Sequence, residues 1–191
     1  MSIGSYWPDH LLTLAEWEAL PEDNSRCYEL VEGVLLASPR PASRHQWATL
    51  RLAAQIEPQL PADYSALVQS EVVVFDGRLP TVRVPDVLAG PSEDLAANLP
   101  RWNATDILLA VEILADGTRR TDRLTKWFEY ADAGIEHYWL LDLEPVRLTA
   151  YRLIGGGYEL VAECSGSVTT ELAGSPITID LTGLTSRRAR G

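Results

Sequence analysis

The most constraining feature of this sequence is an almost unbroken apolar run at residues 107–115, ILLAVEILA. A run of this kind is typical of a β-strand that is buried on both faces. It predicts a sheet covered on both sides, and therefore an α/β or α+β fold with helices packed on the sheet. The single charge in the run, Glu112, would cost several kcal/mol to bury unless a cation or a metal ion pairs with it.

Two kinds of partner would satisfy Glu112. An arginine after the strand, such as Arg119 or Arg120, would form a structural ion pair. The other partner is a metal ion shared with a second carboxylate. Asp86 offers one, because Pro85 cannot donate to a strand ladder and so marks a strand margin where the next side chain is open to a ligand. Such oxygen ligands suit Mg²⁺, which keeps several waters for a substrate phosphate.

The lysine content is the second unusual feature. Of sixteen basic residues, fifteen are arginine and one is Lys126. Arginine is a broad, permanently charged fork, whereas lysine is a compact point charge that can be desolvated beside a reacting bond. In this chain a retained lysine indicates a role that a guanidinium cannot fill, the alternative being a leftover lysine on a helix surface. With Asp86 and Glu112, it completes the minimum set for a metal-dependent phosphodiesterase.

Periodicity and turn signals predict a helix, a β-meander with an inserted helix, the buried strand, another helix and further β-structure. The first hairpin turns on Glu32-Gly33, and Gly134 ends the last long helix. The predicted elements are a helix at 13–20 capped by Thr13 and Glu16, strands at 27–31 and 34–37, a helix at 45–59, a hairpin of 67–75 with 81–88, a helix at about 121–133, a strand at 137–141, a hairpin of 146–154 with 158–162, and β-structure near 177–179.

Helical spacing also predicts which side chains face the core. In the helix at 45–59 the predicted stripe is Trp47, Leu50 and Ala54, with Leu60 after the helix as a further candidate. In the helix at 121–133 it is Leu124, Trp127, Phe128 and Ala131, with Lys126, Asp122 and Tyr130 on the opposite side. That side would face either an active-site cleft or bulk solvent, and Asp122 could simply pair with Lys126.

Composition indicates an ordinary globular chain. Its 191 residues, 46% of them hydrophobic, suffice for one domain with a core. No apolar run reaches the length of a membrane span and the N-terminus lacks signal-peptide features, so we expect a cytoplasmic protein. Cys27 and Cys164 match no zinc or redox spacing and are expected to be free, buried thiols. We expect a helical lead-in at 1–25, one domain at 26–185 and a disordered basic tail at 186–191.

A series of motifs then occurs in order: YELVEGVLLASP at 28–39, VRVPDV at 82–87, LLAVEIL at 108–114, a D-x-x-x-K step at Asp122 and Lys126, and AGIEHYWLLD at 133–142. Together they resemble the Uma-type, restriction-endonuclease-like family of small bacterial proteins, within the PD-(D/E)XK nuclease superfamily. The resemblance runs from about residue 26 to residue 155.

This resemblance implies a PD-(D/E)XK mixed β-sheet core flanked by helices, with extra β-hairpins. It implies that Asp86 and Glu112 hold Mg²⁺, with Mn²⁺ as an alternative ion, and that Glu29 lies near them as a further acidic member of the site. The superfamily lysine normally lies two residues after the glutamate, where this chain has Leu114. The resemblance implies that Lys126 replaces it from the following helix. A serine common two or three residues after the glutamate is absent here.

Four further polar residues are weaker candidates for the site. His45, at the start of a helix, is either a polar neighbour of Glu29 or a capping or surface residue. His137, Glu71 and Asp142 lie in or beside predicted strands and are expected to be structural.

The leading hypothesis is a Mg²⁺-dependent endonuclease that hydrolyses phosphodiester bonds in DNA. The alternative is a catalytically inactive nuclease-fold protein that acts in assembly or regulation. The net charge of −11, which opposes tight metal-free DNA binding, and the absent serine favour the alternative, whereas the intact trio of Asp86, Glu112 and Lys126 favours the enzyme. No G-x-S-x-G elbow supports a metal-independent esterase. Six tryptophans and several apolar β segments predict a homodimer with no membrane partner.

Overall fold

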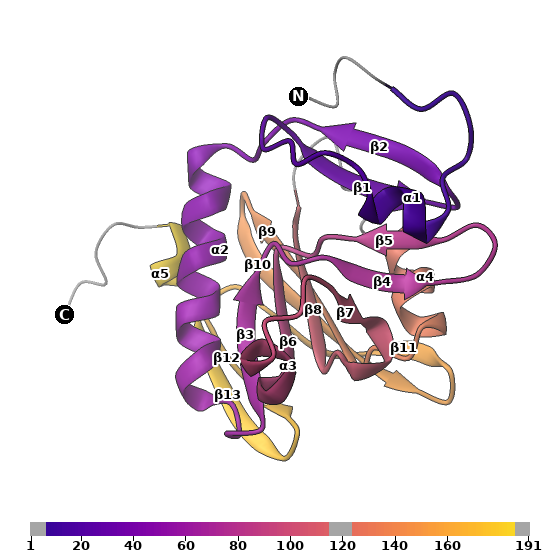
Figure 1. Ribbon diagram of the computed structural model, residues 1–191. Helices are drawn as coiled ribbons and strands as arrows, with labels where there is room; N and C mark the ends of the chain where they lie inside the picture. Colours follow the sequence, from indigo (N-terminus) through magenta and orange to yellow (C-terminus); the bar gives the residue numbers. More distant parts are fainter. Residues whose placement is uncertain (1–6, 115–123, 186–191) are drawn as a thin grey trace.

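The computed structural model describes residues 7–114 and 124–185, which form three sheets. The largest is a mixed sheet in the order β11-β10-β9-β8-β6-β3 (Figure 1). Its strands are β3 (Tyr64–Val68), β6 (Val87–Pro91), β8 (Leu109–Leu114), β9 (His137–Leu143), β10 (Val146–Ile154) and β11 (Gly157–Cys164). β8 pairs antiparallel with β6 and parallel with β9, so the predicted buried strand lies inside the sheet.

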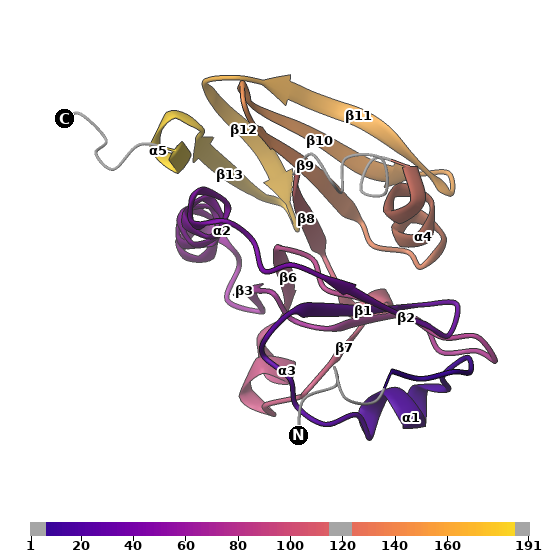
Figure 2. The same cartoon turned by 90° about the horizontal axis from the view of Figure 1, so that it is seen from above.

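A second sheet has the order β2-β1-β5-β4-β7, and β12 pairs with β13 in a separate hairpin. These strands are β1 (Cys27–Val31), β2 (Val34–Ser38), β4 (Val72–Phe75), β5 (Thr81–Arg83), β7 (Trp102–Asn103), β12 (Ser167–Leu172) and β13 (Ser175–Asp180). The helices are α1 (Leu14–Glu18), α2 (Ser43–Ile56), η2 (Glu57–Gln59), α3 (Ser92–Ala96), η3 (Ala104–Asp106), α4 (Lys126–Asp132) and α5 (Thr182–Thr185). In Figure 2, α4 lies between the β1–β2 layer and the layer of β9 to β11.

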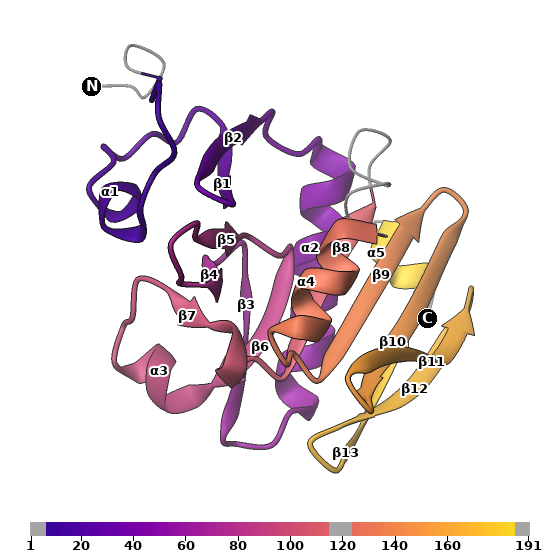
Figure 3. The same cartoon turned by 90° about the vertical axis from the view of Figure 1, so that its right-hand side faces the viewer.

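Both faces of β8 are covered, as the apolar run predicts. All six of its residues are buried. Leu109, Val111 and Ile113 belong to the same apolar cluster as the buried face of α2. Ala110 and Leu114 belong to the cluster that includes α4, which lies in front of β8 and β9 in Figure 3. Glu112 alternates with the first set and therefore faces α4.

Several local predictions are confirmed. Thr13 and Glu16 form a reciprocal capping box at α1. The β1–β2 hairpin turns on Glu32 and Gly33, which have φ of 48° and 79°. Gly134 follows α4 with φ of 86°, a left-handed conformation that glycine adopts without steric cost.

The predicted hairpin of 67–75 with 81–88 is wrong in one respect. Each arm divides into two strands that belong to different sheets: β3 pairs with β6, whereas β4 pairs with β5. Gln69, with φ of 50°, interrupts the first arm, and Pro85 interrupts the second because it has no N–H to donate. The chain therefore crosses between the two sheets twice, and Asp86 lies at the second crossing.

The predicted core stripe of the second helix is also wrong. Trp47, Leu50 and Ala54 are exposed, and only Leu60 packs, partly buried, against the core. The buried face of α2 consists instead of Ala48, Thr49, Leu52, Ala53 and Ile56. Two overlapping stripes satisfy helical spacing here, and the one with small alanines allows α2 to pack against the sheet on one side and against β13 and α5 on another.

The predicted stripe on the helix before Gly134 is mostly reversed. Leu124 and Phe128 are 53% and 60% exposed, whereas Lys126 and Tyr130 are 5% and 0% exposed. Only Ala131 of the predicted stripe is fully buried, with Trp127 half-buried. Polar contacts of the buried side chains, described below, orient this short helix, because a charge enters the interior only with its partners in place.

Two other expectations are corrected by the structure. Cys27 and Cys164 are free, but both are partly exposed rather than buried. The β-structure near 177–179 is a complete hairpin, because β12 precedes β13. In the part of the chain that the structure describes, no helix is both long and apolar enough to cross a membrane. The basic tail at 186–191 lies outside the described residues, and the proposed domain limits stay a prediction.

Candidate active site

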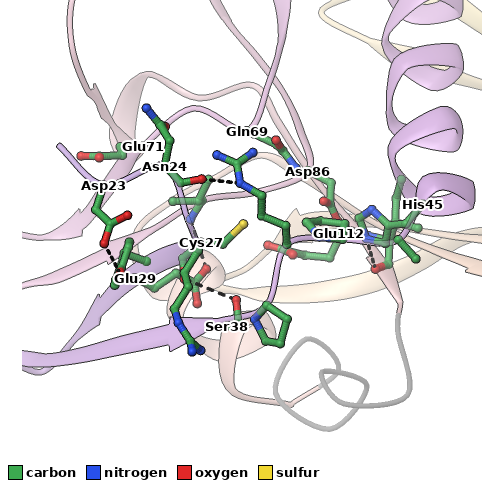
Figure 4. A pocket seen from close by; sticks show the side chains of 18 of the residues that line it. Asp23, Asn24, Cys27, Glu29, Ser38, His45, Gln69, Glu71, Asp86 and Glu112 are labelled. Carbon is green, nitrogen blue, oxygen red and sulfur yellow. Dashed lines mark hydrogen bonds and ion pairs between the residues drawn. The ribbon is translucent and has the colours of Figure 1, made fainter. Parts of the chain in front are cut away.

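A cleft of about 570 Å³ opens where the two larger sheets meet. Its walls come from β1, the segments before and after the β1–β2 hairpin, the first turn of α2, the end of β8 and the first turn of α4. Glu29, Asp86, Glu112 and Lys126, the site residues predicted from the sequence, all line it. Figure 4 shows Asp86, Glu112 and His45 gathered at one end of this cleft.

Asp86 is held beside the end of β8 by strand pairing and by two hydrogen bonds. Val87 pairs with Val111 at the end of the β6–β8 ladder, so Asp86, the residue before Val87, lies beside the end of β8 that carries Glu112. The Asp86 N–H donates to the Val111 carbonyl at 3.0 Å, and its Oδ2 accepts a hydrogen bond from the Ile113 N–H at 2.7 Å. Asp86 therefore lies just before β6 and beside β8, which carries Glu112, and the expectation that the two carboxylates share one ion stays a prediction.

The buried carboxylate of Glu112 is paired with two side chains of the protein, those of Tyr130 and Lys126. Its Oε1 accepts a hydrogen bond from the Tyr130 hydroxyl at 2.8 Å and lies 2.9 Å from the Lys126 ammonium. Burial, and after it the charge of Glu112, raises the pKa of Tyr130 well above its usual value, so the hydroxyl stays protonated and donates. Arg119 and Arg120, the alternative partners, lie outside the described residues.

Lys126 enters the cleft from the first turn of α4. Its Nζ lies 3.0 Å from Glu29 Oε1 and 2.9 Å from Glu112 Oε1. The side chain is 6% exposed, so the lone lysine is a buried cation and not a surface remnant. Asp122, the other residue of its motif, lies outside the described residues.

Glu29 is ionised and held by two cations. Its Oε2 lies 3.0 Å from Arg83 Nη1, and its Oε1 accepts a hydrogen bond from the Val84 N–H at 3.2 Å in addition to the Lys126 contact. Burial raises the pKa of Glu29, but the charges of Lys126 and Arg83 outweigh it and lower the pKa below its usual value.

The sequence predictions missed Arg83 and Glu129. Arg83 is 1% exposed, and its Nε and Nη2 donate to the two carboxylate oxygens of Glu129 at 2.7 and 2.8 Å. The signal that could have found Arg83 is the one that marked Glu112, namely a charge between apolar residues of a strand. Glu129 carried no comparable signal, because glutamates on short helices are usually solvated.

The weaker candidates have defined positions. His45 Nε2 donates to the Ile113 carbonyl at 3.0 Å and lies 3.3 Å from Asp86 Oδ2, so its described contacts are to the Asp86 side of the cleft rather than to Glu29. Glu71 accepts hydrogen bonds from Trp17 and Arg101. His137 and Asp142 are buried on β9.

The chemistry of the donor set suits a hard divalent cation. Asp86 and Glu112 both line the cleft with carboxylate oxygens, and the described hydrogen bonds of Asp86 use Oδ2, which leaves Oδ1 for a ligand. Within residues 7–114 and 124–185, no group of three or more histidine, cysteine, aspartate or glutamate side chains is arranged to hold a metal ion. Two carboxylates agree with Mg²⁺ binding, since this ion keeps waters and phosphate oxygens as its other ligands.

The fold as a whole resembles a solved nuclease-like structure. A crystal structure described as a "putative nuclease belonging to DUF820", from Anabaena variabilis ATCC 29413, superposes with a TM-score of 0.71 at 18% sequence identity. The match covers 91% of this chain and 97% of that chain. The fold is thus that of the restriction-endonuclease-like class.

The family follows from the sequence comparison. The model of the Uma2 family, described as "Putative restriction endonuclease", matches residues 14–182. The chain belongs to this family, as the motif resemblance predicts. Among curated proteins, none matches the sequence significantly.

Proposed function

We propose that the protein is a Mg²⁺-dependent endonuclease that hydrolyses phosphodiester bonds in DNA. One observation carries this proposal: the carboxylates of Asp86 and Glu112 line one cleft together with the buried ammonium of Lys126, which lies 2.9 Å from Glu112. Membership of the Uma2 family supports the nuclease class.

Asp86 and Glu112 would hold the ion through their carboxylate oxygens. A bound Mg²⁺ supplies Lewis-acid polarisation of a phosphoryl oxygen and lowers the pKa of a coordinated water. Glu112 is oriented for this role by the Tyr130 hydroxyl, and Asp86 by the Ile113 N–H. These backbone and side-chain donors fix both carboxylates before substrate arrives, so little reorganisation remains for the reaction.

Lys126 would act on the substrate side of the carboxylates. A phosphate next to Asp86 and Glu112 would lie near its ammonium, which can stabilise the negative charge that develops on the phosphoryl oxygens. The ammonium can also donate a hydrogen bond to the attacking water. The Lys126 side chain is itself buried, and an electrostatic interaction there is stronger than at the surface.

We expect the purified protein to nick or cleave DNA weakly in the presence of Mg²⁺ or Mn²⁺, and EDTA to abolish the activity. Weak, salt-sensitive cleavage is expected because the net charge of −11 opposes the approach of a polyanion. The measurement is a gel assay on supercoiled, linear, branched and single-stranded DNA, with and without each ion. No cleavage of any of these substrates would favour the non-catalytic role in assembly or regulation.

We further propose a homodimer that pairs through β11. This strand ends the six-stranded sheet and carries exposed Leu160 and Val161, and an end strand offers unpaired backbone groups to another chain. Sedimentation velocity at tens of micromolar is expected to show a dimer. Leu160→Glu with Val161→Glu should yield a monomer, whereas Leu50→Glu on the exposed side of α2 should not. A monomeric parent at this concentration contradicts the proposal.

A further inference from the structure

The carboxylate of Glu29 is fully engaged by donors of the protein. Oε2 pairs with Arg83, while Oε1 contacts both the Val84 N–H and the Lys126 ammonium. Asp86 differs, because its described hydrogen bonds leave one oxygen unused. Glu29 therefore has the environment of a residue that holds other side chains in place.

Arg83 holds Glu29 in place through the Oε2 atom, whereas the Lys126 contact is to Oε1. Its guanidinium uses two N–H groups on Glu129 and a third on Glu29, and it is 1% exposed. A guanidinium held in this planar, forked geometry has little freedom to move. Arg83 thereby joins β5 to α4 through Glu129 and to β1 through Glu29.

These contacts form one chain of alternating charges. It runs Glu112, Lys126, Glu29, Arg83 and Glu129, with separations of 2.9, 3.0, 3.0 and 2.7 Å. Lysine is a point charge on a flexible stem, so the position of its ammonium depends on its acceptors. A metal ion bound to Glu112 would weaken the attraction between Glu112 and Lys126. The Glu29 carboxylate, 3.0 Å from the ammonium, would then still hold Lys126 in the cleft.

We propose that Glu29 is a positioning residue that places the Lys126 ammonium against the substrate phosphate, and that Arg83 positions Glu29, neither of them binding the metal ion. This inference rests on the proposed nuclease function. In this scheme Glu29, on β1 of the β1–β2 hairpin, orients the Lys126 side chain, whereas Asp86 and Glu112 bind the metal ion.

Glu29→Gln tests the assignment most directly. The substitution keeps the shape of the side chain but removes the charge that attracts Lys126. We expect kcat to fall about 10- to 100-fold, the range for residues that orient an active-site group. The affinity for Mn²⁺ alone, measured by calorimetry, should change by less than about fivefold, because only a nearby charge and not a ligand is lost.

A spectroscopic readout is available because Lys126 is the sole lysine. Protein labelled with ¹⁵N-lysine should show one side-chain ammonium resonance, visible because hydrogen bonding and burial slow exchange of its protons with water. In Glu29→Gln and Arg83→Lys this resonance should broaden or shift. Glu163→Gln is the matched control, since it breaks the exposed Arg147–Glu163 pair and should leave the resonance, kcat and Mn²⁺ affinity unchanged.

The outcomes separate this inference from the nuclease proposal. An unchanged resonance and kcat in Glu29→Gln would overturn the positioning role, and so would a loss of Mn²⁺ affinity as large as that of Asp86→Asn. Full activity in Asp86→Asn would instead overturn the metal-site proposal. If Arg83→Lys does not fold, Glu29→Gln still decides the role of Glu29. If no DNA is cut, the resonance and the Mn²⁺ affinity decide it alone.

Discussion

Asp86→Asn and Glu112→Gln are each expected to reduce DNA cleavage on the order of 1000-fold or more. Each substitution removes one of the two charged oxygen ligands that we propose for the ion. A loss of this size is expected because metal stabilisation of the transition state is worth several kcal/mol. These isosteric changes are better tests than alanine. Glu112 accepts hydrogen bonds from Tyr130 and Lys126, and truncation would leave both donors without this acceptor at a cost of about 1–3 kcal/mol each.

A thermal measurement checks the same prediction without a DNA substrate. At an ion concentration of about 100 times Kd, binding to the native state adds about 2.7 kcal/mol, which should raise the melting temperature of the parent by roughly 5–10 °C. Neither variant should show this rise, whereas Glu163→Gln should show it in full. An equal rise in all of these proteins would place the ion elsewhere on the molecule and contradict the assignment of Asp86 and Glu112.

Lys126→Arg is expected to lower kcat about 100-fold while the protein stays folded. The ammonium fits between Glu29 and Glu112, at 3.0 and 2.9 Å, in a site where the side chain is 6% exposed. A guanidinium is broader and holds carboxylates with two parallel bonds, so it would pair with these glutamates and leave the substrate phosphate without a compact cation. Overpacking should cost about 1–3 kcal/mol of stability.

The decisive comparison for Lys126 is kcat against melting temperature. Lys126→Met is the companion variant, because it removes the cation that lies beside the Glu29 and Glu112 carboxylates. Without the Lys126 ammonium to compete for Glu112, Mn²⁺ should bind more tightly. An arginine variant as active as the parent would show that the single lysine has no special role. A large loss of stability that parallels the loss of kcat would indicate a structural role instead.

Much of the candidate site was predictable because burial restricts charged residues so strongly. Glu112 was marked by an apolar strand, Asp86 by the preceding proline and Lys126 by its uniqueness among fifteen arginines. The structure brings these three residues and Glu29 into one cleft. Arg83 carried the same signal as Glu112, but a buried arginine is more easily taken for a structural residue, and its partner Glu129 had no signal at all.

The sequence by itself determined the elements that depend on neighbouring residues, namely the buried strand β8, the capping box of α1, the turn at Glu32-Gly33 and the end of α4 at Gly134. Only the tertiary structure decided which faces of α2 and α4 are buried and how the arms around Gln69 and Pro85 are shared between two sheets. The physical reason is that these outcomes depend on distant segments. α2 presents small residues to the sheet and to a hairpin formed near the end of the described chain, and α4 is oriented by Glu29, Arg83 and Glu112 on three different strands. Helical periodicity measures only the apolar side chains within one element, and in α4 ion pairs between elements outweigh it.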